Sequence, residues 1–381
     1  MDTLTQLKSL SSQMFLEPAE DNGCPKLESS KDYAGMVTQA ALPNGKSINL
    51  LKTLLTSACE QDCYYCPFRA GRDFRRATLK PDEMARTFMT MHQVGAVEGL
   101  FLSSGIIRGG VITQDKLITT AEILRHKYNF RGYLHLKIMP GAEYSQVERA
   151  MQLADRVSIN LEAPTSQRLE KLAPHKEFFD ELLQPLRWVH HIREKYPAYQ
   201  GWNNRWPSSV TQFVVGGAGE SDLELLQTTE YLFHQVRLRR AYYSPFNPIP
   251  DTPLENLSPT SPQREHRLYE ASFLLRDYGF SVEELPFEDS GNLPTQVNPK
   301  LAWALANLSQ QPIELNQATR HELLRIPGIG PKGATAILSA RRLRRLNELH
   351  DLQKIGINPT QAIPFILING RQSAHQLPLF H

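Results

Sequence analysis

The sequence predicts an α/β protein, a partial (β/α)6, TIM-like barrel followed by a small all-α domain. From about residue 48 onward, six β-rich segments alternate with amphipathic segments of helical period. Such β-then-α repeats give parallel strands joined by right-handed crossovers, as in a barrel or partial barrel. Residues 315–368 instead show short helical patterns between glycine turns, without strand signals. A doubly wound open sheet is the alternative architecture for the first region.

Each repeat begins with a strand. Strands are expected at 48–57, 98–104, 132–139, 156–162, 209–215 and 239–245, and helices at 81–94, 113–127, 143–154, 176–196, 221–236 and 262–278. The proline-rich stretch 244–253 is expected to form an ordered loop, because proline removes a backbone donor. The expected domains are an N-terminal extension (1–45), the barrel (46–285), a linker (286–311), the all-α domain (312–370) and a flexible tail (371–381).

The composition is that of a globular protein. Of the 381 residues 41% are hydrophobic and 22% are charged, which excludes a disordered or low-complexity chain. The formal net charge is only +2, so a nucleic-acid-binding surface has to be local. No apolar run approaches the roughly 18 residues of a membrane helix, and the N-terminus lacks a signal-peptide pattern. We therefore expect a soluble, cytoplasmic protein without a membrane partner.

Two predicted strands carry polar side chains on a single face. The period of two places Ser158, Asn160 and Glu162 on one face, and His135 and Lys137 share a face in the strand before. Parallel strands covered by helices are normally apolar on both faces, so these polar rows should face water or a ligand. An exposed edge strand is the alternative. His135 and Lys137 are the candidate catalytic residues or ligand contacts, because a buried His–Lys pair needs a partner.

Three of the four cysteines form one cluster. Cys59, Cys63 and Cys66 follow the first predicted strand, with three residues between the first two and two between the second pair, whereas Cys24 stands apart. Without an export signal, such clustering indicates metal binding or redox chemistry. Three thiolates in a compact loop suit an iron–sulfur cluster with one iron open to a small molecule. The alternatives are a redox pair and a zinc site completed by Cys24 or a histidine, although zinc usually takes two ligand pairs.

This spacing, with Tyr65 directly before the third cysteine, resembles the signature of the radical S-adenosylmethionine (radical SAM) enzymes. The resemblance implies a [4Fe-4S] cluster held by Cys59, Cys63 and Cys66. It also implies that the open iron chelates S-adenosylmethionine, which an electron cleaves to methionine and a 5′-deoxyadenosyl radical. The family fold is a full or partial (β/α) barrel. An electron donor such as flavodoxin or ferredoxin is implied as a partner.

The resemblance also implies which residues contact S-adenosylmethionine. These are Tyr65, Ser104 and Gly105 after the second strand, Asn160 and Glu162 ending the fourth, and Gly216 and Gly217 after the fifth. The turn at 103–105 would meet the methionine amino group, although it lacks the commoner Gly-Gly-Glu form. Asn160 and Glu162 would bind the ribose hydroxyls, and the glycine turn would contact the adenosine. Plain tight turns are the alternative for both turns.

The C-terminal region contains a glycine hairpin. Gly328 and Gly330 precede a helix that begins with Pro331, and Lys332 adds charge to the positive end of its dipole. Exposed N–H groups there favour a phosphate. The pattern resembles the helix-hairpin-helix motif of DNA-binding and DNA-repair proteins, and residues 354–358 look like a second, degenerate hairpin. Arg341 and Arg342 open a basic run, so the predicted DNA-binding residues are Gly328, Gly330, Lys332, Arg341 and Arg342. A solvated face or a protein-interaction module is the alternative.

Two further segments suggest partners. Arg69, Arg72, Arg75 and Arg76 follow the cysteines and could grip a phosphate backbone at the barrel mouth, or be ordinary surface residues. The tail from Gln376 to Phe380, with the sequence QLPLF, resembles the peptides that bind the bacterial sliding clamp. Both segments are compatible with a protein that works on DNA.

From about residue 30 to its end, the chain resembles the radical SAM proteins described as acting in DNA modification or repair. The leading hypothesis is an enzyme that generates a 5′-deoxyadenosyl radical and uses it on DNA. One alternative is a radical SAM enzyme that modifies tRNA or another RNA, since phosphate contacts do not separate the two. The other is a non-enzymatic DNA-binding protein with a structural iron–sulfur cluster.

Overall fold

The structure is a computed structural model that describes residues 2–12, 14, 33, 35–41 and 47–372. Contacts divide the chain into two units, residues 1–220 with 231–260 and residues 221–230 with 261–381. The domain boundaries expected from the sequence stay a prediction. Cys24 and the peptide 376–380 lie outside the described residues.

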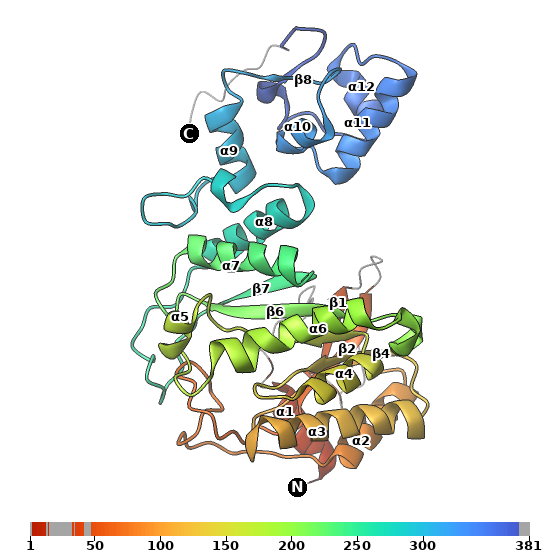
Figure 1. The fold of residues 1–381 in the computed structure, drawn as a ribbon, viewed down its shortest axis with the longest axis vertical. Helices are drawn as coiled ribbons and strands as arrows, with labels where there is room; N and C mark the ends of the chain where they lie inside the picture. The colour runs from red at the N-terminus through yellow and green to blue at the C-terminus, as the bar shows by residue number, and fades with distance from the viewer. Residues whose placement is uncertain (1, 13, 15–32, 34, 42–46, 373–381) are drawn as a thin grey trace. The chain divides into compact units, whose positions relative to one another are not determined.

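The first unit is built on a seven-stranded sheet in the order β1 to β7 (Figure 1). The strands are β1 (Val37–Ala41), β2 (Ser47–Leu54), β3 (Gly99–Ser103), β4 (Tyr133–Lys137), β5 (Arg156–Ser158), β6 (Ser208–Val215) and β7 (Arg240–Pro245). β1 runs antiparallel to β2, and all later neighbours are parallel. Because β1 and β7 end the strand order, the sheet is a curled half-barrel. The predicted partial barrel is confirmed, and β1 is an addition that the sequence did not predict.

Helices connect the strands. They are α1 (Thr3–Ser12), α2 (Pro81–Gln93), α3 (Gly109–Glu122), α4 (Tyr144–Leu153), α5 (Ser166–Glu170), α6 (Gln184–Lys195) and α7 (Asp222–Gln235). π-helical segments extend α3 over Ile123–Lys127 and precede α6 over Phe178–Leu183. Figure 1 shows α2, α3, α4 and α6 packed side by side along the sheet, and neighbouring pairs among them are in contact. No helix of the described residues is long and apolar enough to span a membrane.

The strand faces separate as the alternation predicts. Leu134 and Leu136 are completely buried on one face of β4, and Lys137, on the other face, lines a cavity. The polar row therefore faces the inside of the curled sheet. β5 is shorter than the expected 156–162 and ends at Ser158, and Glu162 further along has a left-handed backbone (φ 64°). Its backbone makes one isolated bridge to Phe213.

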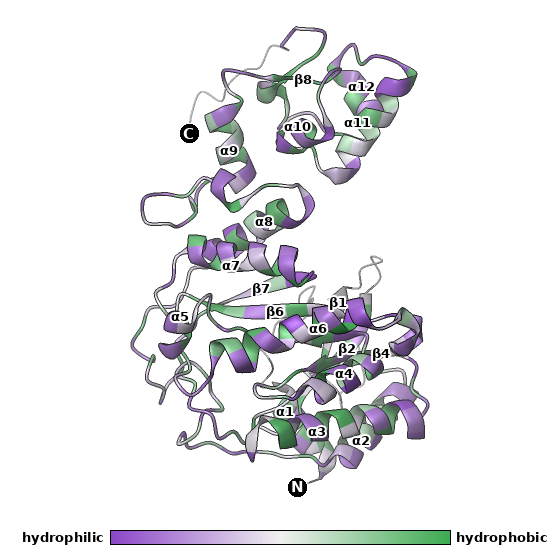
Figure 2. Ribbon diagram, in the orientation of Figure 1, coloured by the Kyte–Doolittle hydropathy of each residue, from purple (hydrophilic) through white to green (hydrophobic). Residues whose placement is uncertain are grey.

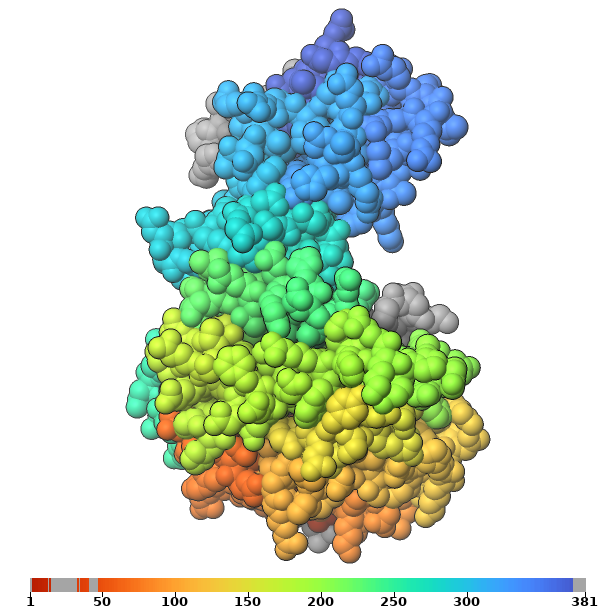
Figure 3. Space-filling view, viewed as in Figure 1, coloured from red at the N-terminus to blue at the C-terminus, as the bar shows by residue number. Residues whose placement is uncertain are grey.

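The second unit is mainly helical. It contains α8 (Pro262–Asp277), α9 (Pro299–Asn307), α10 (Arg320–Arg325), α11 (Pro331–Leu343) and α12 (Leu349–Lys354). The ribbon in Figure 2 is green at hydrophobic residues of these helices and their turns. Their buried core includes the fully buried Leu323, Ile329 and Ile337. A parallel pair of two-residue strands, β8 (Ile313–Glu314) and β9 (Ile366–Leu367), corrects the all-α expectation. Strands this short have no period for the sequence to reveal. Figure 3 shows the atoms of the C-terminal residues, in blue, gathered in one body.

Candidate active site

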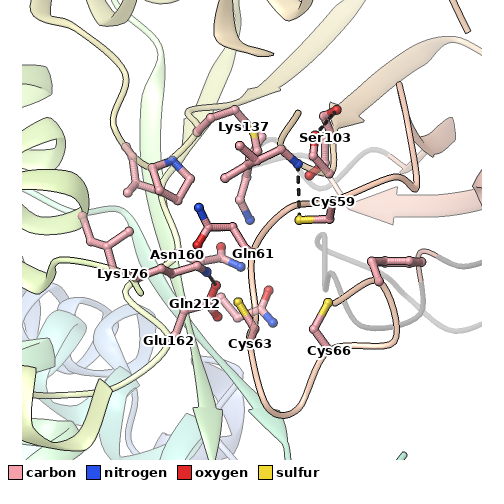
Figure 4. A pocket seen from close by; sticks show the side chains of 18 of the residues that line it. Cys59, Gln61, Cys63, Cys66, Ser103, Lys137, Asn160, Glu162, Lys176 and Gln212 are labelled. Atoms are coloured by element: carbon pink, nitrogen blue, oxygen red, sulfur yellow. Dashed lines mark hydrogen bonds and ion pairs between the residues drawn. The ribbon is translucent and has the colours of Figure 1, made fainter. Parts of the chain in front are cut away.

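A cavity of about 110 Å³ lies where the parallel strands end, beside the cysteine loop (Figure 4). The sequence-predicted residues that line it are Cys59, Tyr65, Cys63, Cys66, Ser104, Gly105, Lys137, Asn160 and Glu162. They come from the loop after β2, the turn after β3, the end of β4 and the segment after β5. The carboxyl ends of parallel strands meet at one edge, so residues far apart in sequence gather here.

The three cysteines lie on one loop, and Figure 4 shows their sulfur atoms around a common space. Burial raises the pKa of the Cys63 thiol to about 11 and also raises that of Cys66. No three His, Cys, Asp or Glu side chains among residues 2–12, 14, 33, 35–41 and 47–372 are placed to hold a single metal ion.

Backbone contacts fix the cysteine loop to its neighbours. The Ile106 N–H donates to Cys59 Sγ at 3.4 Å. Glu60, between the first two cysteines, accepts from the backbone N–H groups of Arg108 (2.9 Å) and Gly109 (2.7 Å) at the start of α3. A carboxylate suits this position, because the first N–H groups of a helix have no partner within it. The turn after β3 and the cysteine loop are thus one connected structure.

Of the glycines in the two predicted cofactor turns, only Gly105 lines the cavity among the described residues. A Cβ on Gly105 would lie 2.2 Å from the Ala58 carbonyl oxygen, so only glycine allows this approach to the cysteine loop. Gly216 has φ 92°, and its N–H donates to the Glu220 carboxylate. Gly216 and Gly217 do not line the cavity among the described residues. Their contact with a cofactor stays a prediction.

Glu162 is the most constrained polar residue of the site. Its Oε1 accepts from Lys176 Nζ at 3.0 Å, and both side chains are less than a tenth exposed. Burial alone would lower the pKa of Lys176, but the nearby Cys63 and Glu162 raise it above its ordinary value. Lys176 is therefore a cation beside the thiols. Glu162 Oε2 and Gln61 Oε1 are buried acceptors for which the described residues supply no hydrogen bond.

The C-terminal unit contains the predicted hairpin. α10 begins at a capping box in which the Thr319 hydroxyl accepts from the Glu322 N–H, and α11 begins at Pro331. Between them Gly328 has φ 78°, which other residues rarely adopt. Lys332 in the first turn of α11 is exposed. The hairpin thus presents a helix N-terminus beside a lysine, the arrangement that favours phosphate.

Two details of this unit depart from the expected phosphate site. Arg341 Nη1 donates to the Leu315 (2.7 Å) and Ala318 (2.8 Å) carbonyls, so this guanidinium is used inside the domain, whereas Arg342 is exposed. The second hairpin has a left-handed Gly356 (φ 80°), but a 3-10 turn, Ile363–Phe365, stands where an α-helix would follow. It therefore offers no helix N-terminus like that of α11.

Family comparisons agree with both sites. The model of the radical SAM superfamily matches residues 53–232, which include the three cysteines and the cavity. The chain contains a radical SAM domain. A model of a SAM-like helix-hairpin-helix tandem matches residues 295–344 and again 320–362, around the hairpin. No curated protein matches the chain.

Several solved structures resemble the chain at low identity. The FeFe-hydrogenase maturase HydG from Carboxydothermus hydrogenoformans is 14% identical with a TM-score of 0.47, over 60% of this chain and 51% of that chain. Methylornithine synthase (PylB) is 14% identical with a TM-score of 0.48, over 60% and 61%. The cobalamin-dependent S-adenosylmethionine radical enzyme OxsB is 9% identical with a TM-score of 0.35, over 80% and 51%. The matches thus span little more than half the length of those chains.

The cavity fits the two cofactors of the radical SAM superfamily, a [4Fe-4S] cluster and S-adenosylmethionine. Three thiols from one loop match a cluster with one open iron. A buried acceptor without a partner is costly, so Glu162 Oε2 and Gln61 Oε1 suit the amino and hydroxyl groups of a bound ligand. Burial, with Glu162 close by, keeps the pKa of Tyr65 well above its ordinary value, so its hydroxyl stays protonated.

The two catalytic candidates on β4 are separated by depth. Lys137 lines the cavity, whereas His135 is buried and is not among the residues that line it. His135 Nε2 is 2.9 Å from Ser158 Oγ, and its ring stacks on Phe101 at 4.2 Å. Burial, with the cations Arg156, Lys137 and Lys52, holds the pKa of His135 well below its ordinary value. His135 is therefore a neutral residue of the barrel interior, and a role for either residue in catalysis stays a prediction.

Two of the arginines that follow the cysteines donate to backbone carbonyls. Arg72 donates to the Pro250 (3.0 Å) and Pro67 (3.2 Å) carbonyls, and Arg69 donates to the Asp62 carbonyl at 3.4 Å. These donors serve backbone carbonyls of the loop itself and of Pro250. The phosphate grip expected of Arg69, Arg72, Arg75 and Arg76 stays a prediction.

Three polar cavity residues escape the sequence reasoning: Gln61, Lys176 and Gln212. Gln61 lies between two of the cysteines, and Gln212 is a polar residue on β6 in register with the polar rows, so both carry a signal. Lys176 comes from the loop after α5, which has no period, and no pattern marks it.

Proposed function

We propose that this chain is an enzyme that reductively cleaves S-adenosylmethionine and uses the resulting radical on a nucleic acid, with DNA as the substrate. The observation that carries the proposal is the cavity of three thiols and two unpaired buried acceptors within the radical SAM domain. The same chain carries a helix-hairpin-helix tandem. The proposed process is therefore the modification or repair of DNA.

The residues have distinct roles in this proposal. Cys59, Cys63 and Cys66 hold the [4Fe-4S] cluster, which when bound supplies the electron that releases a 5′-deoxyadenosyl radical from S-adenosylmethionine. Asn160 and Glu162 orient the cofactor by accepting from its hydroxyl groups. Lys176 balances the negative charge of the thiolates in a buried setting, where charge is poorly screened. A ferredoxin or flavodoxin is the proposed electron donor.

The helix-hairpin-helix unit is proposed to hold the nucleic acid by its backbone. Gly328 and Gly330 allow a phosphate to approach the N-terminus of α11, and Lys332 and Arg342 add exposed positive charge. Contacts to the phosphate backbone give affinity without base specificity. They therefore suit a protein whose target occurs in many different nucleotide sequences. The tail 376–380 is proposed to bind the sliding clamp.

Anaerobic reconstitution tests the enzymatic proposal. The full chain, loaded with iron and sulfide and reduced with dithionite, is expected to release 5′-deoxyadenosine from S-adenosylmethionine, and Cys63→Ala is expected to release none. A fully iron-loaded chain that releases no 5′-deoxyadenosine would leave the structural-cluster alternative. Adding matched duplex DNA to one reaction and structured RNA to another then identifies the substrate. Only the nucleic acid that the enzyme modifies should change in mass.

A further inference from the structure

The cysteine loop has almost no secondary structure of its own. It leaves the sheet after β2 and closes where the Ser57 N–H donates to the Ala77 carbonyl (3.0 Å) and the Leu79 N–H donates to the Leu55 carbonyl (2.9 Å). Residues 58–76 thus form a loop that is closed at its neck. Backbone carbonyls in such a loop need partners other than a helix or a ladder.

Arg76 stands at this neck and supplies those partners. Its Nη1 donates to the carbonyl oxygens of Ser57 and Phe68, both at 2.9 Å, and its Nη2 donates to those of Arg69 (2.9 Å) and Arg72 (3.3 Å). Ser57 comes two residues before the first cysteine, and Phe68 comes two residues after the third. One guanidinium therefore joins the two ends of the segment that carries all three thiols.

We propose that Arg76 is a positioning residue for the iron–sulfur cluster, which holds the cysteine loop in its binding conformation before the cluster enters. A planar guanidinium can serve several carbonyls at fixed angles, which an ammonium cannot. Its plane is fixed by Phe74, whose ring centroid lies 4.3 Å from Cζ. Groups that orient metal ligands set metal affinity. The proposal rests on the cluster assignment and not on the nucleic-acid substrate.

Iron retention by the reconstituted full chain tests this role. With a colorimetric iron chelator in excess, Arg76→Gln is expected to lose iron about tenfold faster than the wild type. Arg76→Lys keeps the positive charge but loses the planar guanidinium that contacts several carbonyls. It is expected to lose iron almost as fast as Arg76→Gln. Arg75→Gln is the matched control, because Arg75 is the exposed neighbour, and it should retain iron like the wild type.

Hydrogen exchange of the cluster-free chain separates positioning from general stability. In Arg76→Gln the amides of residues 58–76 should exchange faster, while those of β3, β4 and β6 keep the wild-type rate. Arg76→Lys carries the same test if Arg76→Gln does not fold. Wild-type iron retention, or faster exchange spread over all strands, would overturn the proposal. Neither readout depends on cofactor cleavage, so this outcome is distinct from a failure of the proposed function.

Discussion

At the scale of single residues, Glu162 combines a strained backbone with a buried carboxylate. Glu162 has a left-handed backbone (φ 64°), and only one of its oxygens is paired, with Lys176. A non-glycine residue in this region carries a backbone cost, and such residues concentrate at functional sites. The Glu162 side chain lines the cavity. Its strained backbone and its burial support the proposed role of Glu162 in ligand binding.

Removing Lys176 should cost stability. Lys176→Met leaves a buried carboxylate without its cation, and breaking a buried pair in this way costs about 3 kcal/mol. Urea unfolding of the cluster-free chain measures the free energy of unfolding. Arg149→Met is the control, because Arg149 and Glu122 are each 39% exposed and such pairs contribute less than about 1 kcal/mol. Equal losses in the two variants would contradict the account.

Site residues that belong to a recognisable sequence pattern could be predicted from the sequence. Residues that only the folding of the chain brings into the site could not. The cysteine spacing and the alternation of β4 and β5 predicted Cys59, Lys137 and Asn160 at one cavity. Lys176 could not be predicted, because only the folded loop brings it to Glu162. Arg341 looked like surface charge, yet its guanidinium satisfies two carbonyls of the domain.

At the scale of elements, the hydrophobic period predicted six strands and the helices between them. The period could not reveal where α3 widens into a π-helical segment at Ile123–Lys127, because the change shifts the hydrogen bonds and not the residue type. It also could not predict β1, which pairs antiparallel outside the repeat. The errors of the sequence-based prediction thus lie where the local hydrophobic pattern does not determine the backbone hydrogen bonding.

The packing of α9 on the hairpin predicts a pH dependence. Burial, with Arg325 nearby, lowers the pKa of Lys300 to about 7, while its Nζ donates to the Ile329 carbonyl at 2.6 Å. Above that pH the unfolded chain binds a proton at Lys300 that the folded chain does not, so Lys300 makes stability rise with pH toward its ordinary pKa.

Unfolding of the wild type and of Lys300→Met measures this dependence. The free energy of unfolding of the wild type minus that of the variant should increase from pH 7 to pH 10 and stay level from pH 5 to pH 6. Taking the difference removes the titration of other groups. A difference that is level over the whole range would show that Lys300 keeps its ordinary pKa.

The helix-hairpin-helix element predicts a change in salt dependence. Lys332→Glu combined with Arg342→Glu should weaken duplex binding, and each lost phosphate contact lowers the slope of log K against log salt by about 0.9. Fluorescence anisotropy at several salt concentrations measures the slope. Lys127→Glu changes an exposed lysine of the barrel unit and serves as the charge control. An unchanged slope in the double variant would remove the hairpin from the binding surface.

At the scale of the whole molecule, the chain joins a radical SAM domain to a helix-hairpin-helix tandem. The net charge of +2 gives the whole chain little attraction for nucleic acid, so the proposed binding depends on the local charge of the hairpin. Tethering two sites in one chain raises the effective concentration of substrate at the second once the first is bound. The sequence predicted both modules because each has its own motif, but no motif names the atom that the radical attacks.

The most direct measurement is electron–nuclear double resonance on the reduced cluster with isotope-labelled S-adenosylmethionine. If Cys59, Cys63 and Cys66 leave one iron open, the labelled amino nitrogen and carboxylate oxygen should show hyperfine coupling to the cluster. The coupling should disappear in Cys63→Ala. A cluster that forms fully but shows no coupling to the label, or a chain that binds zinc in its place, would contradict the account.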